Sequence, residues 1–142
     1  MNMTSEMMDM LDGTMPGMDM QMMQECMESC MACEQACTMA AGMMPEDDMM
    51  MKHMMPMMSM HMNCADMCGA MGRAMMRPAG MERTSMMAML EACMTMCRAC
   101  ADMCMMHADM MPSCKMTAEV CSNCADACQK MMDSMKSMMA TD

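Results

Sequence analysis

The sequence feature that most constrains the fold is a row of cysteines with steps of four, three and four residues. The segment CMESCMACEQAC places this row at Cys26, Cys30, Cys33 and Cys37. An α-helix turns by roughly 100° per residue, so these steps bring all four side chains back to within about 60° of one another. The segment therefore predicts a helix with one face made of thiols.

The same rhythm recurs at three further places in the chain. CMTMCRACADMC repeats it at residues 93–104, and CKMTAEVCSNCADAC carries the steps seven, three and four at residues 114–128. The segment MMSMHMNCADMC, at residues 57–68, is a sparser copy in which Met57 and His61 occupy the first two places. These repeats predict four helices, each with one sulfur-bearing face.

Glycine and proline separate the four rows, in the segments AAGMMPEDD, MRPAGMERTS and HADMMPSC. Pro45 and Pro112 are expected to start helices, and Pro56 to kink or restart one. The predicted helices lie near residues 18–41, 46–76, 84–109 and 112–139. Short connections make neighbouring helices antiparallel, which predicts an up-down-up-down four-helix bundle.

Composition supports an all-α fold with a core of unusual chemistry. The 142 residues include 45 Met and 14 Cys but no Phe, Tyr, Trp or Ile, and the branched aliphatic residues are Leu11, Leu90 and Val120. Strand-forming residues are thus scarce, whereas Met and Ala are strong helix formers. The interior of the bundle must be built from sulfur-bearing side chains and alanine.

The first seventeen residues differ from the remainder of the chain. They contain Gly13, Pro16 and Gly17, and we expect a flexible Met-rich segment over residues 1–17, with one turn of helix near Ser5–Leu11, ahead of a bundle domain over residues 18–142. The segment has no basic start and is interrupted by acids, so it resembles neither a signal peptide nor a membrane span. Fourteen thiols favour the reducing cytoplasm; a periplasmic location is the alternative if a leader has been removed.

The net charge of −11 is uneven, since residues 1–51 contain ten acids and no Lys or Arg. This balance disfavours nucleic acid and anionic membranes as partners and favours cations. The acids also keep a Met-rich chain in solution, and the two interpretations are compatible.

Five explanations of the cysteines can be compared. As core fillers they would be too small for fourteen converging positions, and as disulfide partners their Cβ atoms would point the same way along each helix. No segment matches a bacterial iron–sulfur motif, and zinc gains little from thioethers. Thiolate together with thioether is the ligand set that selects Cu(I), with residues four apart supplying two thiols to one ion.

Charge favours many ions over one. Buried thiolates without metal would be too costly, so the metal-free core holds neutral thiols that lose protons as Cu(I) binds. If each thiolate is shared by two ions, the numbers of copper ions and thiolates become similar and the core stays near neutral. The predicted thiolate ligands are Cys26, Cys30, Cys33, Cys37, Cys64, Cys68, Cys93, Cys97, Cys100, Cys104, Cys114, Cys121, Cys124 and Cys128.

In an antiparallel bundle the histidines fall at one end, together with many methionines. We expect this end to load copper through labile donors that pass the ion to thiolates inside. The predicted donors are His53, His61, His107, Met43, Met44, Met54, Met57, Met110 and Met111. Runs such as Met49–Met51 must leave some thioethers exposed, and MPGMDMQMM looks like a copper-collecting segment; exposed Met could equally consume oxidants.

The segments EACMTMCRACADMC, HADM, CKMTAEVCSNCADAC and CMESCMACEQAC resemble the bacterial copper storage proteins, which are Cys-rich four-helix bundles. The likeness covers roughly residues 22–132. It implies storage of many Cu(I) ions by the 14 Cys, loading from an open end with His107 and the Met/His group of residues 43–61, and homo-oligomers. Thr117, where the last row could take another Cys, and the replacement of aliphatic residues by Met depart from the family pattern.

The preferred hypothesis is a non-enzymatic Cu(I) storage and buffering protein that binds several copper ions per chain. Copper donor and acceptor proteins are implied as partners. A single-ion metallochaperone and a Met/Cys oxidant buffer are the alternatives. The first needs one or two accessible sites and the second needs no register of thiols, so the repeated rows favour storage.

Overall fold

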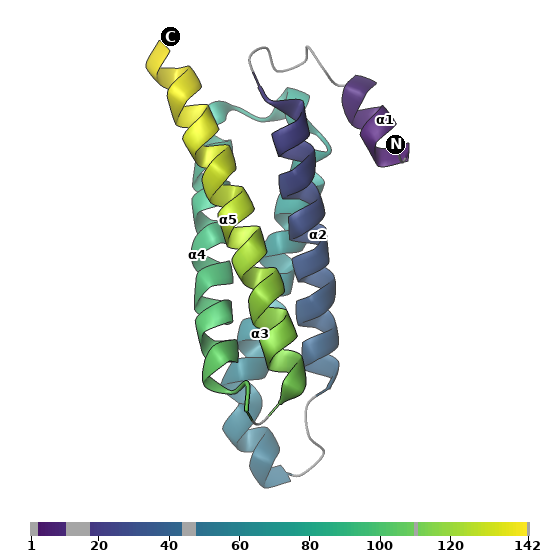
Figure 1. Cartoon of the computed structure of the whole chain (residues 1–142), viewed down its shortest axis with the longest axis vertical. Helices are drawn as coiled ribbons and strands as arrows, with labels where there is room; N and C mark the ends of the chain where they lie inside the picture. Colours follow the sequence, from purple (N-terminus) through teal and green to yellow (C-terminus); the bar gives the residue numbers. More distant parts are fainter. Residues whose placement is uncertain (1–2, 11–17, 44–47, 110, 142) are drawn as a thin grey trace.

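The protein is a bundle of four long antiparallel helices with a short helix at its N-terminal side (Figure 1). The computed structural model describes residues 3–10, 18–43, 48–109 and 111–141. The long helices are α2 (Met20–Gly42), α3 (Asp48–Met75), α4 (Arg83–Met106) and α5 (Pro112–Thr141). The all-α, up-down-up-down bundle is therefore confirmed, and each helix packs against its two neighbours in the ring α2, α3, α4, α5.

Local sequence explains most of the helix boundaries. The Asp19 side chain accepts a hydrogen bond from the Met22 N–H at 3.0 Å, which caps the start of α2. Pro112 begins α5, as predicted, because its missing N–H is not needed in the first turn. The expected start at Pro45 lies outside the described residues. A short 3-10 helix, η1 (Pro78–Gly80), which the sequence did not predict, joins α3 to α4.

α3 continues through Pro56 as one helix, so the predicted restart there is wrong. Proline removes one backbone hydrogen bond without forbidding helical backbone angles, and packing on both sides of it compensates for that loss. Met54 and Met57, which flank Pro56, are both buried. The first turns of α3 extend beyond the other helices at the lower end of the bundle in Figure 1.

Two glycines allow α3 to approach α2 closely. A Cβ at Gly69 would lie 2.6 Å from a carboxylate oxygen of Glu34, and one at Gly72 would lie 3.3 Å from Met31 Cγ. Glycine at these two positions lets the backbones of α2 and α3 come close together. The thiol rows on the two helices therefore also lie closer to each other.

The N-terminal helix α1 (Met3–Met10) is longer than the single turn expected near Ser5–Leu11; Leu11 itself lies outside the described residues. Met8 is buried, and Gln24 of α2 donates a hydrogen bond to Ser5. The described part of the MPGMDMQMM segment also contributes to packing, since Met18 and Met23 are buried. A thioether in the core cannot collect ions from solvent without local opening.

The core divides along the bundle axis into a thiol region and a methionine region. All fourteen cysteines are buried and free. Beyond them, at the end formed by the start of α2 and α4 and the end of α3 and α5, lies a fully buried group that we call the closed end: Met23, Met71, Met75, Met86, Leu90, Met131 and Met135. The opposite end, near His61 and Cys114, is called the loading end below. None of the helices in the described ranges is long and apolar enough to cross a bilayer.

Candidate metal centre

Four helices supply one continuous column of thiols. Each cysteine row faces the bundle axis, because the steps of three and four residues keep every thiol on the buried side of its helix. Each of the fourteen Sγ atoms lies within 4.0 Å of another potential soft-metal donor atom. The predicted convergence of the four rows is therefore present.

The closest thiols come from different helices. Cys68 Sγ lies 3.4 Å from Cys97 Sγ, and Cys33 Sγ lies 3.5 Å from Cys121 Sγ. Within one helix, Cys33 and Cys37 lie 4.0 Å apart. The spacing of four residues therefore brings two thiols together as expected, but contacts across the bundle axis are tighter and contribute more pairs.

These separations suit a shared metal ion and not a disulfide, whose sulfurs lie about 2.05 Å apart. With a metal–sulfur bond of about 2.3 Å, as in thiolate sites, sulfurs 3.4–4.0 Å apart subtend roughly 95–120° at the ion. Such angles fit three or four sulfurs around each ion better than a linear pair.

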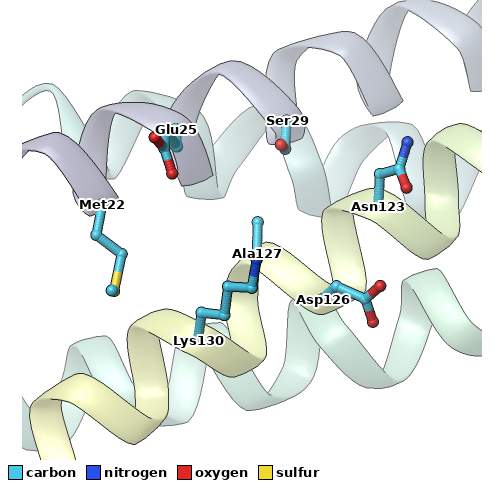
Figure 2. Close-up of a pocket in the computed structure, with 7 residues that line it drawn as sticks. All are labelled: Met22, Glu25, Ser29, Asn123, Asp126, Ala127 and Lys130. Carbon is cyan, nitrogen blue, oxygen red and sulfur yellow. The ribbon is translucent and has the colours of Figure 1, made fainter.

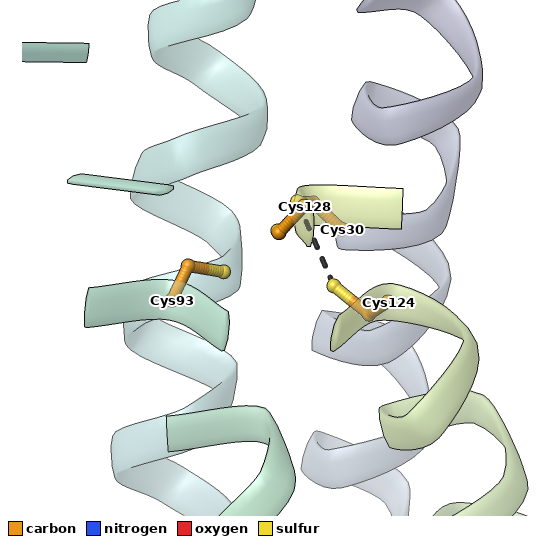
Figure 3. A group of neighbouring side chains, drawn as sticks. All are labelled: Cys30, Cys93, Cys124 and Cys128. Carbon is orange, nitrogen blue, oxygen red and sulfur yellow. Dashed lines mark hydrogen bonds between the residues drawn. The ribbon is translucent and has the colours of Figure 1, made fainter. Parts of the chain in front are cut away.

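Three tetrathiol groups follow one another along the axis. The ligand atoms within each group all lie within 4.8 Å of one another. Figure 3 shows the group nearest the closed end, with Cys30 Sγ and Cys124 Sγ 3.7 Å apart and joined by a dashed line. The groups are Cys30, Cys93, Cys124 and Cys128; Cys33, Cys68, Cys97 and Cys124; and Cys33, Cys37, Cys64 and Cys121.

Two cysteines belong to more than one of these groups. Cys124 is shared by the first and second groups, and Cys33 by the second and third. A thiolate that bridges two ions halves the negative charge needed per ion, which is the condition under which a buried cluster stays near neutral. The column is therefore built for linked ions and not for isolated sites.

At the loading end the donor set changes from sulfur alone to sulfur with nitrogen. His61 is fully buried, with Nδ1 3.6 Å from Cys100 Sγ and Nε2 3.9 Å from Cys104 Sγ. It therefore belongs to two groups, one with Cys37 and Cys100 and one with Cys104 and Cys114. A single imidazole thus links the outermost thiols to the inner column.

Met57 places a thioether beside the outermost thiol. Cys114 Sγ lies 3.8 Å from Met57 Sδ, and both side chains are buried. The combination of thiolate, thioether and imidazole suits soft monovalent copper better than Mg²⁺ or Ca²⁺, which prefer oxygen.

The other predicted loading-end donors lie in varied environments. Met54 is buried, Met111 is half-buried, and Met43 is exposed just after the end of α2. His107 is half-buried at the end of α4, where Nδ1 lies 3.0 Å from the Met103 carbonyl oxygen, so Nε2 is the nitrogen that faces other partners. Met44, Met110 and the side chain of His53 lie outside the described residues.

Thr117 interrupts the thiol row of α5, as the sequence indicated. Its side chain is buried, and Oγ1 donates a hydrogen bond to the Ser113 carbonyl oxygen at 2.8 Å. The hydroxyl is thus satisfied by its own helix and offers no soft ligand. The break falls between Cys114 and Cys121, at the boundary between the mixed-donor region and the tetrathiol column.

Hydrogen bonds among the thiols separate their pKa values. Hydrogen bonding with Cys128 and then Cys30 lowers the pKa of Cys26 to about 5, and hydrogen bonding with Cys104, Cys121 and Cys37 lowers that of Cys100 to about 3. The bond with Cys100 in turn raises the pKa of Cys104. At Cys114, burial is the main cause that raises the pKa. The column therefore mixes groups that hold their protons with groups that release them to neighbours.

Methionine was expected in the core, but the sequence did not predict that these residues gather at the closed end. The steps of three and four residues that define the cysteine rows continue beyond the last cysteine. On α5, for example, Cys128 is followed by Met131 and Met135, both fully buried. The signal was therefore present in the sequence.

Comparison with known proteins gives consistent matches. A sequence model of the copper storage protein family matches residues 19–133. The copper storage protein Ccsp from Streptomyces lividans, solved with 10 copper equivalents, is 31% identical with a TM-score of 0.86, and the match covers 92% of this chain and 98% of that chain. A search of curated proteins finds no significant match.

Two further structures from the same organism are similar. A cytosolic copper storage protein with five coppers is 34% identical with a TM-score of 0.75, over 80% of this chain and 93% of that chain. A Ccsp variant in which one histidine is replaced by alanine is 34% identical with a TM-score of 0.78, over 84% and 98% of the two chains.

Proposed function

The chain belongs to the copper storage protein family, and on this premise we propose that it holds many Cu(I) ions between buried cysteine thiolates. The observation that carries the proposal is the sharing of Cys33 and Cys124 between successive tetrathiol groups. Linked groups supply several ions with few thiolates, whereas a chaperone that delivers one ion needs a single accessible pair. The protein is a store and not a carrier of single ions.

The proposed ligands are assigned by position along the axis. The fourteen cysteines bind the stored ions, and His61 and Met57 complete the outermost sites. The remaining predicted donors of the loading end are proposed to pass ions inward, and this set consists of His53, His107, Met43, Met44, Met54, Met110 and Met111. Transfer is downhill because thiolates bind Cu(I) more strongly than neutral donors do.

Charge governs how filling proceeds. Each Cu(I) that binds a protonated thiol replaces one proton and so exchanges one positive charge for another, whereas a group that is already a thiolate, such as Cys26, is neutralised by the ion that it binds. The acidic surface, with a net charge of −11, raises the local concentration of cations around the bundle. Storage therefore requires no large change in the charge of the interior.

Further features are part of the same proposal. We propose a non-enzymatic role, residues 18–142 as the storage domain, and residues 1–17 as a separate Met-rich segment. The similar protein from Streptomyces lividans is described as cytosolic, and we propose the same compartment here. Assembly into homo-oligomers, and exchange of copper with donor and acceptor proteins, also belong to the proposal.

The test is an anaerobic titration of the reduced, metal-free protein with Cu(I) against a competing chromogenic chelator. Storage predicts saturation at many tightly held ions per chain, counted independently by mass spectrometry. Saturation at one or two ions would indicate a chaperone. If no ion is taken from the chelator, the oxidant-buffer hypothesis remains and the storage proposal is wrong.

A further inference from the structure

The seam between α2 and α5 is open to solvent in two stretches of opposite chemistry. Figure 2 shows the stretch nearer the closed end, a groove of about 240 Å³ with polar side chains that include Glu25, Asp126 and Lys130. Nearer the loading end, the same seam forms a groove of about 310 Å³ whose walls are mostly apolar. The two grooves share their helices, so the difference comes from the side chains.

Three thioethers line the apolar groove. Met39 lies in the last turns of α2, Met43 directly follows the end of that helix, and Met116 forms part of the α5 wall. They are 58%, 58% and 72% exposed, respectively. Core packing does not explain side chains this accessible, and three of them around one groove present three soft donors to solvent.

Small side chains line the buried side of this groove. Thr117 and Ala40 line it and are buried, and Ala36, which also lines it, directly precedes Cys37 in the chain. Thr117 occupies the row position between Cys114 and Cys121. Small side chains are therefore what separates the exposed thioethers from the thiol column.

We propose that Met39, Met43 and Met116 form a surface site that captures Cu(I) and supplies it to the column across the α2–α5 seam. The inference rests on the proposed storage function. A thioether site leaves Cu(I) with its positive charge, which is tolerable in a solvent-exposed groove but costly in the core. On transfer, the ion leaves the neutral thioethers and binds a cysteine sulfur, whose proton passes to solvent; copper stays monovalent throughout.

The polar stretch of the seam does not offer such a site. Met22 is the one thioether that lines it, and its other polar groups, including the carboxylates of Glu25 and Asp126, are oxygen and nitrogen donors that soft copper disfavours. Capture is therefore specific to the stretch that lies over the break at Thr117.

The test is the rate of copper uptake by Met39→Leu/Met43→Leu/Met116→Leu from a Cu(I)–chelator complex, followed by stopped flow under anaerobic conditions. Leucine preserves volume and apolar character but removes the sulfur. Uptake should slow by about tenfold, the lower end of what a locally raised ion concentration does for an association rate, while the saturating copper count stays unchanged. The matched control is Met55→Leu/Met62→Leu/Met76→Leu, which removes two other exposed thioethers from α3 and one directly after its end and should load at the wild-type rate.

A second readout observes the site directly. In protein labelled with ¹³C at the methionine methyl groups and already saturated with copper, added Cu(I) should shift the resonances of Met39, Met43 and Met116 but not those of the control residues. Equal uptake rates for wild type and groove variant, or equal slowing in the control, would overturn the capture site. Those results leave the storage function intact, whereas a wild type that binds no copper would overturn both proposals.

Discussion

The two ends of the bundle use the same side chain in opposite environments. At the closed end, methionines such as Met75 and Met131 are fully buried and act as flexible core packing. At the loading end, Met57 Sδ lies 3.8 Å from Cys114 Sγ, and Met106 is 81% exposed. Burial and the neighbouring donors, not residue type, therefore decide whether a methionine packs, binds metal or meets solvent.

The largest expected effect is stabilisation of the folded chain by copper. At a free Cu(I) concentration of about a thousand times Kd, each ion bound by the folded state alone adds about 4.1 kcal/mol to the free energy of unfolding. For a chain of this size even one such ion should raise Tm by roughly 8–16 °C. Hydrogen exchange should show the gain concentrated in the thiol region, with little change around the closed end. An equal increase in hydrogen-exchange protection in the thiol region and around the closed end would contradict the view that copper binds only in the thiol region.

Stability of the metal-free protein should depend on the closed end. Met75→Ala empties a fully buried position and should lower the free energy of unfolding by about 2–5 kcal/mol. The matched substitution Met106→Ala, at a position 81% exposed, should change it by less than about 0.5 kcal/mol. Chemical denaturation under reducing conditions measures both. Similar losses for the two variants would show that the ends are not packed differently.

Copper affinity should depend on the loading end. His61→Leu removes the nitrogen donor shared by two groups and should weaken the outermost sites by at least the roughly 10–100-fold that losing a supporting ligand contact costs. Met71→Leu, a volume-conserving change at the closed end, should leave both affinity and copper count unchanged. Chelator competition separates these outcomes. A loss of copper from the Met71→Leu variant would mean that closed-end thioethers are ligands.

The smallest effect concerns pH. Hydrogen bonding with Cys128 and then Cys30 lowers the pKa of Cys26 to about 5, so this group is already a thiolate at pH 7, and Cu(I) competes with a proton there only as pH falls through about 5. Burial raises the pKa of Cys114, so Cu(I) must displace its proton at neutral pH. Affinity at Cys114 should therefore fall by about tenfold per pH unit as pH decreases from 8 to 6, since one pKa unit is about 1.36 kcal/mol.

Proton release on copper binding, measured potentiometrically at pH 7, tests this difference. Cys114→Ser should release one proton fewer than the wild type at saturation, because a proton-bearing ligand is gone. Cys26→Ser should release the same number as the wild type. Equal reductions in both variants would contradict the assignment of the two protonation states.

The comparison also shows what the sequence could and could not provide. The cysteine steps predicted the helices, their buried faces and the convergence of four rows, because periodicity depends on local geometry alone. They did not predict that Cys68 and Cys97 approach to 3.4 Å, since that distance depends on how closely the helices pack. Close approach of α2 and α3 at Gly69 and Gly72 is a property of the assembled bundle.

Some errors of the sequence analysis have equally specific causes. Pro56 was expected to kink or restart a helix; the restart is wrong, because α3 continues through this residue with Met54 and Met57 buried on either side of it, and the kink stays a prediction. The histidines could be assigned to one end but not distinguished from one another. The structure places His61 between thiols, whereas His107 contacts the backbone of its own helix. Such differences depend on side-chain direction at a helix end, which spacing does not determine.

Anomalous diffraction at the copper edge from crystals of the anaerobically loaded protein tests the central claim most directly. The account predicts a row of copper peaks along the bundle axis from Cys26 to Cys114, with Cys33 and Cys124 each bound to more than one ion and no copper among the closed-end methionines. Peaks confined to exposed methionines around an empty thiol column, or cysteines joined as disulfides in the loaded protein, would contradict it.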